Sequence, residues 1–269
     1  MYTDCHTHLT DDKLFPEWDK HMEDFQKIWW KTLINVWINE TWSEKAINIK
    51  KEAYFNYPDL EILASIGFHP LGIAFQDFDE KDFKDKINYL ENLYYKEKEN
   101  ISALWECWID TFYDNQKTLE KQKKFFKMQC ELANKLSLPL IIHSRNEFEE
   151  TFNILKEFKH LKIYFHCRCY GPEEVKRLQE NFPYIWIWYT GIVTFPKSKE
   201  VSNSLHETKF ENLLLETDAP YLAPQAKRWK LNKPDYIKHI YEDVANQLDC
   251  DLDFLQDTVY QNFKRFLEN

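Results

Sequence analysis

The chain has 269 residues, of which 43% are hydrophobic and 17% aromatic, and a formal net charge of −10. This composition supplies a large buried core, so it excludes disorder as a description of the whole chain. No run approaches the ~20 apolar residues of a membrane-spanning helix, and from the first residues we expect no secretory signal. The six cysteines form no CxxC pair. We therefore expect a cytoplasmic protein with reduced thiols, and its acidic charge argues against a broad basic surface for polyanions.

Eight apolar runs rich in β-branched and aromatic residues recur along the chain and predict strands. They occupy residues 2–8, 32–38, 60–69, 101–110, 138–145, 162–168, 184–189 and 212–218. Segments such as 119–136 and 172–181 carry apolar residues three and four apart and predict helices, as does the sequence from 235 onward. Strands that alternate with helices over ~250 residues predict an α/β fold, a (β/α)8 TIM barrel. No linker divides the chain, so we expect residues 1–269 to form one domain.

Polar side chains stand at the C-terminal ends of six of these runs. They are His6, His8, His69, Glu106, Asp110, His143, His166, Glu216 and Asp218. In a TIM barrel these strand ends converge on one mouth, where such enzymes build their active sites. Residues i and i+2 of a strand face the same way, so the pairs His6 with His8 and Glu216 with Asp218 are each expected to point together into the barrel.

Imidazoles and carboxylates from separate strands form a donor set typical of divalent metal ions. The six candidate ligands are His6, His8, Glu106, His143, His166 and Asp218. Six donors exceed what one tetrahedral ion needs and suit two ions bridged by a carboxylate, for which Glu106 is the candidate. A lone histidine at a strand end is more often structural, but coincidence is the poorer account of six such residues at one mouth. Asp4 is expected to orient its strand or to contact a histidine.

Several motifs together resemble one family over nearly the whole chain. The motifs are DCHTHL at 4–9, GFHP at 67–70, WECWID at 105–110, IHSR at 142–145, FHC at 165–167, LETDAPYLAP at 215–224 and NFKRF at 262–266. In order and spacing they resemble the TatD family of metal-dependent deoxyribonucleases. The resemblance implies a metallohydrolase TIM barrel that hydrolyses phosphodiester bonds in DNA.

Carried over residue by residue, the resemblance implies two divalent ions (Mg, Mn or Zn). His6, His8 and Asp218 would hold one ion, His143 and His166 the other, and Glu106 both. Two such ions would clamp the scissile phosphate and activate a water, and they would supply the positive charge that an acidic protein lacks. Asp218 is then the candidate general base, and His69 is expected to contact the phosphate or the leaving group.

Further residues are candidates for contacts with the DNA substrate. Arg145 shares the direction of His143 and is expected either to bind a phosphate or to close the rim with a salt bridge. Lys227, Arg228 and Lys230, with Asn232 in register, resemble the family's Arg-Gly-Lys-x-Asn segment, so we favour contact with a nucleic-acid backbone over a solvated charge cluster. Tyr113 and Tyr221 are candidates for stacking on bases.

Two other functions remain open from the sequence. A deaminase or amide hydrolase uses the same barrel, although many of those relatives carry a carboxylated lysine on the fourth strand, where this chain has Glu106. A non-catalytic nucleic-acid-binding or metal-binding barrel is the other alternative. We expect no membrane association; the oligomeric state is not fixed by the sequence, and a monomer is the default.

Tryptophan is overrepresented and glycine underrepresented. The chain has 10 Trp and 4 Gly, whereas average usage of ~7% predicts roughly 19 glycines. Trp37, Trp105, Trp108, Trp229 and either Trp186 or Trp188 stand where the family pattern has glycine, and Trp108 is expected to point at the metal centre. Lysine outnumbers arginine 30 to 5, as in AT-rich genomes. We interpret the repeated exchange as UGA codons for glycine that are written as tryptophan. The alternative is a protein truly rich in tryptophan with a crowded barrel.

Overall fold

The computed structural model describes residues 1–28, 30–36, 40–68, 76–112, 117–166 and 170–268. All eight predicted strands are present and pair in parallel, in sequential order, within one sheet. They are β1 (Tyr2–Thr7), β2 (Trp30–Asn35), β3 (Glu61–Ile66), β4 (Ala103–Asp110), β5 (Leu140–Arg145), β6 (Ile163–His166), β7 (Ile185–Tyr189) and β8 (Leu213–Leu215).

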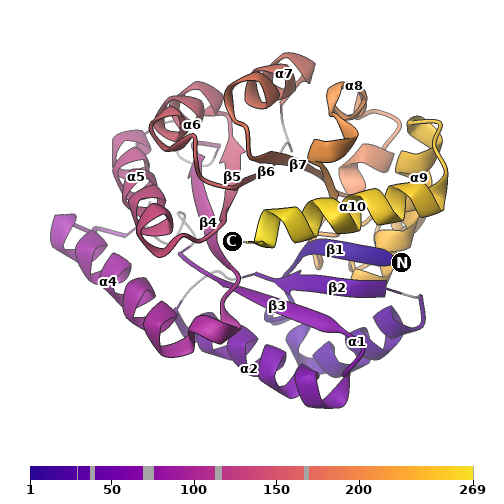
Figure 1. Ribbon diagram of the computed structural model, residues 1–269, viewed down its shortest axis with the longest axis horizontal. Helices are drawn as coiled ribbons and strands as arrows, with labels where there is room; N and C mark the ends of the chain where they lie inside the picture. The colour runs from indigo at the N-terminus through magenta and orange to yellow at the C-terminus, as the bar shows by residue number, and fades with distance from the viewer. Residues whose placement is uncertain (29, 37–39, 69–75, 113–116, 167–169, 269) are drawn as a thin grey trace.

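Helices follow the strands and form an outer layer around them (Figure 1). They are α1 (Trp18–Gln26), α2 (Glu40–Asn56), α4 (Glu80–Glu97), α5 (Leu119–Leu136), α6 (Phe148–Leu155), α7 (Pro172–Asn181), α8 (Lys199–Glu207), α9 (Ile237–Gln247) and α10 (Leu252–Leu267). The predictions at 119–136 and 172–181 are confirmed residue for residue as α5 and α7. The predicted (β/α)8 barrel is thereby confirmed.

The strands are almost continuously apolar because both of their faces are covered. Strand β7 shows this directly, since all five of its residues are buried. The sequence prediction placed the end of the last strand at 218, but β8 ends at Leu215. Asp218 itself has a φ of 55°, in the left-handed region, which extended strand geometry does not allow. Glu216 and Asp218 therefore stand on the segment that leaves the sheet rather than on the strand.

This segment closes the barrel against β1. Asp218 donates its backbone N–H to the carbonyl of His6 at 3.0 Å, and His8 donates to the carbonyl of Ala219 at 2.8 Å. Thr7 and Ala219 form a parallel bridge. The bonds that join the first and last strands thus fall on the residues that the sequence names as ligands.

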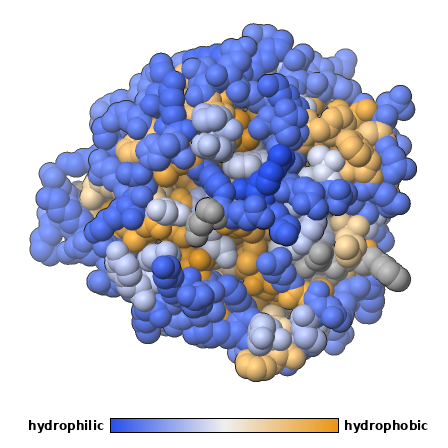
Figure 2. Space-filling view, in the orientation of Figure 1, coloured by the Kyte–Doolittle hydropathy of each residue, from blue (hydrophilic) through white to orange (hydrophobic). Residues whose placement is uncertain are grey.

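Helix α10 packs against β1 and β8 at the end of the barrel away from their C-terminal ends (Figure 1). Its Asn262 amide donates to the carbonyl of Leu213, the first residue of β8, at 2.8 Å. In this orientation the surface is largely hydrophilic, with apolar residues showing between the helices (Figure 2). Among the described residues, no helix is both long enough and apolar enough to span a bilayer.

Candidate metal centre

Three of the predicted ligands converge at the C-terminal ends of β1 and β8. The Nε2 atoms of His6 and His8 lie 3.1 Å apart. A carboxylate oxygen of Asp218, Oδ1, lies 3.4 Å from Nε2 of His6 and 3.2 Å from Nε2 of His8. All three residues are buried. The described part of the chain thus contains a triangle of donor atoms that could hold a metal ion.

The triangle has the dimensions that a metal ion requires. Bonds of about 2.0–2.2 Å at octahedral to tetrahedral angles place neighbouring ligand atoms roughly 3–3.6 Å apart. Ligating imidazoles must also be neutral. Burial, followed by the neighbouring His8 and His143, lowers the pKa of His6 well below its ordinary value. The residues present therefore fit a divalent cation.

Backbone pairing and a buried carboxylate hold the triangle in place. The Asp4 carboxylate accepts from the hydroxyl of Thr217 at 2.6 Å and from its backbone N–H at 2.9 Å. Asp4 also accepts from the backbone N–H of His6 at 3.3 Å. Of the two roles predicted for Asp4, the structure thus shows the orientation of the strand. Its burial raises the pKa of this carboxyl to about 7.

The second predicted ligand group lies on β4, β5 and β6. His143 is buried, and its Nε2 atom lies 4.0 Å from a carboxylate oxygen of Asp110. Backbone register places His143 beside His166 and beside Trp108. The side chains of Glu106 and His166 lie outside the described residues, and so do all atoms of His69.

Strand β4 carries an irregularity beside Glu106. Leu104 pairs with Leu140 while Cys107 pairs with Ile142, so β4 contains one extra residue. Such bulges redirect side chains and are common beside active sites. Strict alternation with Glu106 facing inward would turn Trp105 outward, yet the Trp105 indole faces His6. The side chain of Trp108, predicted to point at the metal centre, lies outside the described residues.

Two indoles pack on the imidazole of His6. Its ring centroid lies 4.0 Å from that of Trp105 and 4.6 Å from that of Trp188, both in edge-to-face arrangements. Trp105 is fully buried and Trp188 nearly so. The His6 imidazole thus has polar groups beside it on the side of β1 and β8, and aromatic rings beside it on the side of β4 and β7.

Of the predicted substrate contacts that the structure describes, Arg145 is the last residue of β5 and the others lie after β8. The Arg145 guanidinium stacks on the exposed ring of Phe112, with its central carbon 3.4 Å from the ring centroid. Tyr221 is half-exposed, 5.8 Å from His8 between ring centroids. Tyr113 lies outside the described residues.

The basic loop after β8 is held by a buried amide. The Asn232 side chain donates to the carbonyl of Thr217 at 2.8 Å and to that of Tyr221 at 2.5 Å. Lys227, Arg228 and Lys230 belong to this loop, and the Arg228 guanidinium lies over the ring of Phe195. Asn232 therefore ties the basic loop to the residue that precedes Asp218.

Glu216 makes a contact that the sequence did not predict. Its spacing predicted only that it faces the same way as Asp218. One of its carboxylate oxygens lies 3.4 Å from Nδ1 of His6 and accepts the hydroxyl of Tyr164 at 3.0 Å. Tyr164 lies two residues before His166, and this spacing could have indicated that it faces the barrel interior.

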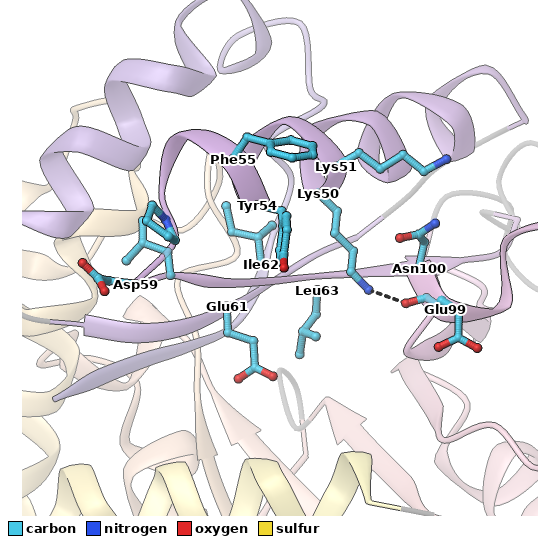
Figure 3. Close-up of a pocket in the computed structure, with 12 residues that line it drawn as sticks. Lys50, Lys51, Tyr54, Phe55, Asp59, Glu61, Ile62, Leu63, Glu99 and Asn100 are labelled. Atoms are coloured by element: carbon cyan, nitrogen blue, oxygen red, sulfur yellow. Dashed lines mark hydrogen bonds between the residues drawn. The ribbon is translucent and has the colours of Figure 1, made fainter.

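A groove of about 670 Å³ lies far from these donors, at the N-terminal ends of β3 and β4. Figure 3 shows Lys50 and Tyr54 of α2 above β3, with the Lys50 ammonium donating to the carbonyl of Glu99 at 3.0 Å. In TIM barrels this end is associated with stability rather than chemistry. The candidate site is therefore the mouth.

Fold and donor triangle together are typical of metal-dependent hydrolases of the TIM-barrel type. The family model described as TatD related DNase matches residues 3–268, and the chain belongs to this family. A protein named as an uncharacterized metal-dependent hydrolase from Mycoplasma pneumoniae is 30% identical over 268 residues, which are 98% of each chain. A similarly named protein from Mycoplasma genitalium is 31% identical over 269 residues, again 98% of each chain.

Solved structures agree on the fold. A TatD homologue from Escherichia coli superposes with a TM-score of 0.86 at 18% identity, covering 99% of this chain and 97% of the other. A TatD family hydrolase from Entamoeba histolytica superposes with a TM-score of 0.83 at 19% identity, with the same coverage. The resemblance of the sequence motifs to the TatD family is thereby confirmed.

Proposed function

We propose that this protein hydrolyses phosphodiester bonds of DNA with the help of two divalent metal ions at the barrel mouth. The observation that carries the proposal is the triangle of His6, His8 and Asp218, whose donor atoms lie within 3.1–3.4 Å of one another. Membership of a family described as TatD related DNase supports DNA as the substrate.

In this proposal, His6, His8 and Asp218 hold one ion, His143 and His166 hold a second, and Glu106 contacts both. Backbone pairing of His143 with His166 supports the second group. When bound, the ions supply Lewis acidity and lower the pKa of a coordinated water. Asp218 is buried beside both imidazoles, and its carboxylate is placed to accept a proton during hydrolysis.

The proposed phosphate contacts are His69, Arg145, Lys227, Arg228 and Lys230. A chain with a net charge of −10 repels DNA over most of its surface, so these side chains and the ions must attract the backbone locally. Arg145 suits this role because stacking on Phe112 fixes its guanidinium plane.

The experiment is a cleavage assay on single-stranded, duplex and abasic DNA with Mg²⁺, Mn²⁺ or Zn²⁺. Glu106→Ala and Glu106→Gln are compared with the unmodified chain and with Glu242→Gln, a change in an exposed carboxylate of α9. We expect cleavage that requires metal, that is lost in both Glu106 variants and that persists in the control. Cleavage that survives the loss of Glu106 would contradict the two-ion site. Deamination of adenine and cytosine nucleosides is measured in parallel, and such activity without DNA cleavage would contradict the nuclease proposal.

A further inference from the structure

Glu216 is a fully buried carboxylate beside the donor triangle, and the ligand set does not include it. We propose that Glu216 is a positioning residue that selects the metal-binding tautomer of His6, and that the Tyr164 hydroxyl fixes the Glu216 carboxylate. This inference rests on the proposed metal site, whose ligands are described above. The His6 atom involved is Nδ1, which faces away from the triangle.

The geometry of His6 requires an acceptor on that side. Its Nε2 atom faces His8 and Asp218, so Nε2 must be unprotonated to bind an ion. A neutral imidazole then carries its proton on Nδ1. The Glu216 oxygen at 3.4 Å is positioned to attract that proton and so to favour the tautomer with a free Nε2.

Tyr164 and the backbone hold the carboxylate in place. The Tyr164 hydroxyl donates to the same Glu216 oxygen at 3.0 Å, and burial and the Glu216 charge keep the pKa of this phenol well above its ordinary value. Tyr164 therefore remains a donor. The backbone N–H of Glu216 donates to the carbonyl of Tyr189 at 3.2 Å, which ties Glu216 to β7.

The two imidazoles of the triangle differ in what lies beside their Nδ1 atoms. The Nδ1 atoms of both histidines are buried and make no hydrogen bond among the described residues, but that of His6 has a Glu216 carboxylate oxygen 3.4 Å away, and no such oxygen is found near Nδ1 of His8 in the described part of the chain. Removal of Glu216 is therefore expected to act on His6 alone. This asymmetry lets an experiment separate a positioning role from a general loss of packing.

The test uses the full chain with Glu216→Ala, Glu216→Gln and Tyr164→Phe. Tyr57→Phe is the matched control, because the hydroxyl of this buried tyrosine donates to the carbonyl of Asp19 at 3.0 Å and has no contact with Glu216 or His6 among the described residues. Calorimetric titration with Mn²⁺ or Zn²⁺ measures affinity, and nitrogen-15 NMR of labelled histidines reports the tautomer of His6.

We expect affinity about 10–100-fold lower in Glu216→Ala, a smaller loss in Glu216→Gln, whose amide oxygen can still attract the Nδ1 proton, and no loss in Tyr57→Phe. His6 should change from Nδ1–H towards Nε2–H in Glu216→Ala. If Glu216→Ala does not fold, Tyr164→Phe must still weaken binding. An unchanged affinity and tautomer in the folded variants would overturn the positioning role, whereas an unmodified chain that binds no metal would overturn the metal site itself.

A second, independent observation concerns the tryptophans. Trp229 has a φ of 71°, in the left-handed region that glycine adopts without strain, and its side chain is 91% exposed. The largest apolar side chain thus occupies a strained backbone and gains almost no burial there. Neither the backbone nor the surroundings of residue 229 favour tryptophan.

Buried tryptophans fill space or bury a polar N–H at other positions. Trp105 and Trp188 fill the space beside His6, where a substrate and water must approach the ligands. The indole N–H of Trp186 is buried without a hydrogen bond among the described residues, which is costly for a polar group. Trp105 and Trp188 thus fill the barrel interior beside His6, whereas Trp186 packs on Phe266 of α10.

We infer that these positions carry glycine in the protein made by its own cell, through UGA codons read as glycine. Replacing all tryptophans would give fourteen glycines, close to ordinary usage. Strain at residue 229 would then disappear, and space would open beside His6. The identity of the residues at these positions does not depend on which bond the protein hydrolyses.

Mass spectrometry of the protein purified from its native source provides the test. We expect an intact mass that matches ten glycines at the tryptophan positions, and peptides that contain glycine at residues 105, 188 and 229. Peptides with tryptophan at these three residues would overturn the inference. A recombinant ten-glycine chain is compared with the ten-tryptophan chain by calorimetry, and we expect tighter metal binding in the former.

Discussion

The two sides of the barrel mouth are constructed differently around the same imidazole. On the side of β1 and β8, Asp218 approaches His6, and backbone hydrogen bonds hold both strands in register. On the side of β4 and β7, Trp105 and Trp188 pack against His6 with aromatic carbon. The side of β1 and β8 provides the donor atoms of an ion site, whereas the tryptophans of β4 and β7 control the access of substrate and water to it. Donor atoms that could hold an ion and a site that substrate can reach are therefore separate requirements.

The largest effect is expected from the ligand side. Asp218→Asn removes a carboxylate that is both the proposed ligand and the candidate base while nearly preserving shape, so metal-dependent hydrolysis should fall about 10²–10⁴-fold. Steady-state cleavage of DNA at saturating metal measures this decrease. Asp235→Asn, which changes a carboxyl in the turn before α9, is the control and should retain activity. Equal rates in Asp218→Asn and the unmodified chain would remove Asp218 from the mechanism.

The tryptophan side predicts a smaller effect on stability. Truncating a well-packed aromatic core residue costs about 3–5 kcal/mol, and Phe125→Ala in α5 should show this full cost. We expect Trp105→Gly to cost clearly less, because it relieves crowding at the mouth, and to strengthen metal binding. Urea unfolding and calorimetry measure both quantities. A cost as large as that of Phe125→Ala would show that Trp105 is an ordinary core residue.

The link between β1 and the segment after β8 should contribute less again. Thr217→Val removes a hydrogen bond to the buried Asp4 carboxylate, and we expect about 1–3 kcal/mol of destabilisation. Metal affinity should also fall, because Asp218 is the next residue. Thr208→Val, which removes a hydrogen bond with Tyr189, is the control. Thr208→Val should lower the free energy of unfolding without lowering metal affinity. Identical metal affinities in Thr217→Val and Thr208→Val would show that the bond between Thr217 and Asp4 does not support the ion site.

The basic loop is expected to affect binding rather than turnover. Changing Lys227, Arg228 and Lys230 together to alanine should raise KM for DNA with kcat nearly unchanged. The slope of log affinity against log salt should fall by roughly one for each phosphate that is no longer neutralised. Cleavage kinetics at several salt concentrations measure both. An unaltered KM and salt slope would identify the cluster as solvated surface.

The smallest effect is expected at His21, a histidine outside the mouth. It tests how a buried histidine that is not a proposed ligand affects the pH dependence of stability. Burial, followed by the charge of Lys233, lowers the pKa of His21 below its ordinary value. The unfolded chain therefore binds this proton more readily, so stability should fall as the pH drops below about 6.5. His21→Gln should lose part of this acid sensitivity in thermal melts and keep its metal affinity. An acid sensitivity identical to that of the unmodified chain would exclude His21 as its source.

The sequence predicted the barrel and the polar residues that follow its strands because apolar runs and the polar residues after them are local features. It predicted the convergence of His6 and His8 from their spacing. It could not predict the bulge in β4, which turns Trp105 towards His6, because a register shift depends on the pairing with β5. The end of β8 at Leu215 and the left-handed backbone of Asp218 follow from barrel closure against β1, which lies at the opposite end of the sequence. The contact between Glu216 and Tyr164 has the same long-range origin.

The most direct test of the ion site is anomalous diffraction from crystals grown with Mn²⁺ or Zn²⁺. We predict an anomalous peak about 2.0–2.2 Å from Nε2 of His6, Nε2 of His8 and a carboxylate oxygen of Asp218. An ion bound at full occupancy elsewhere, with these three side chains free of metal in an active protein, would contradict the account.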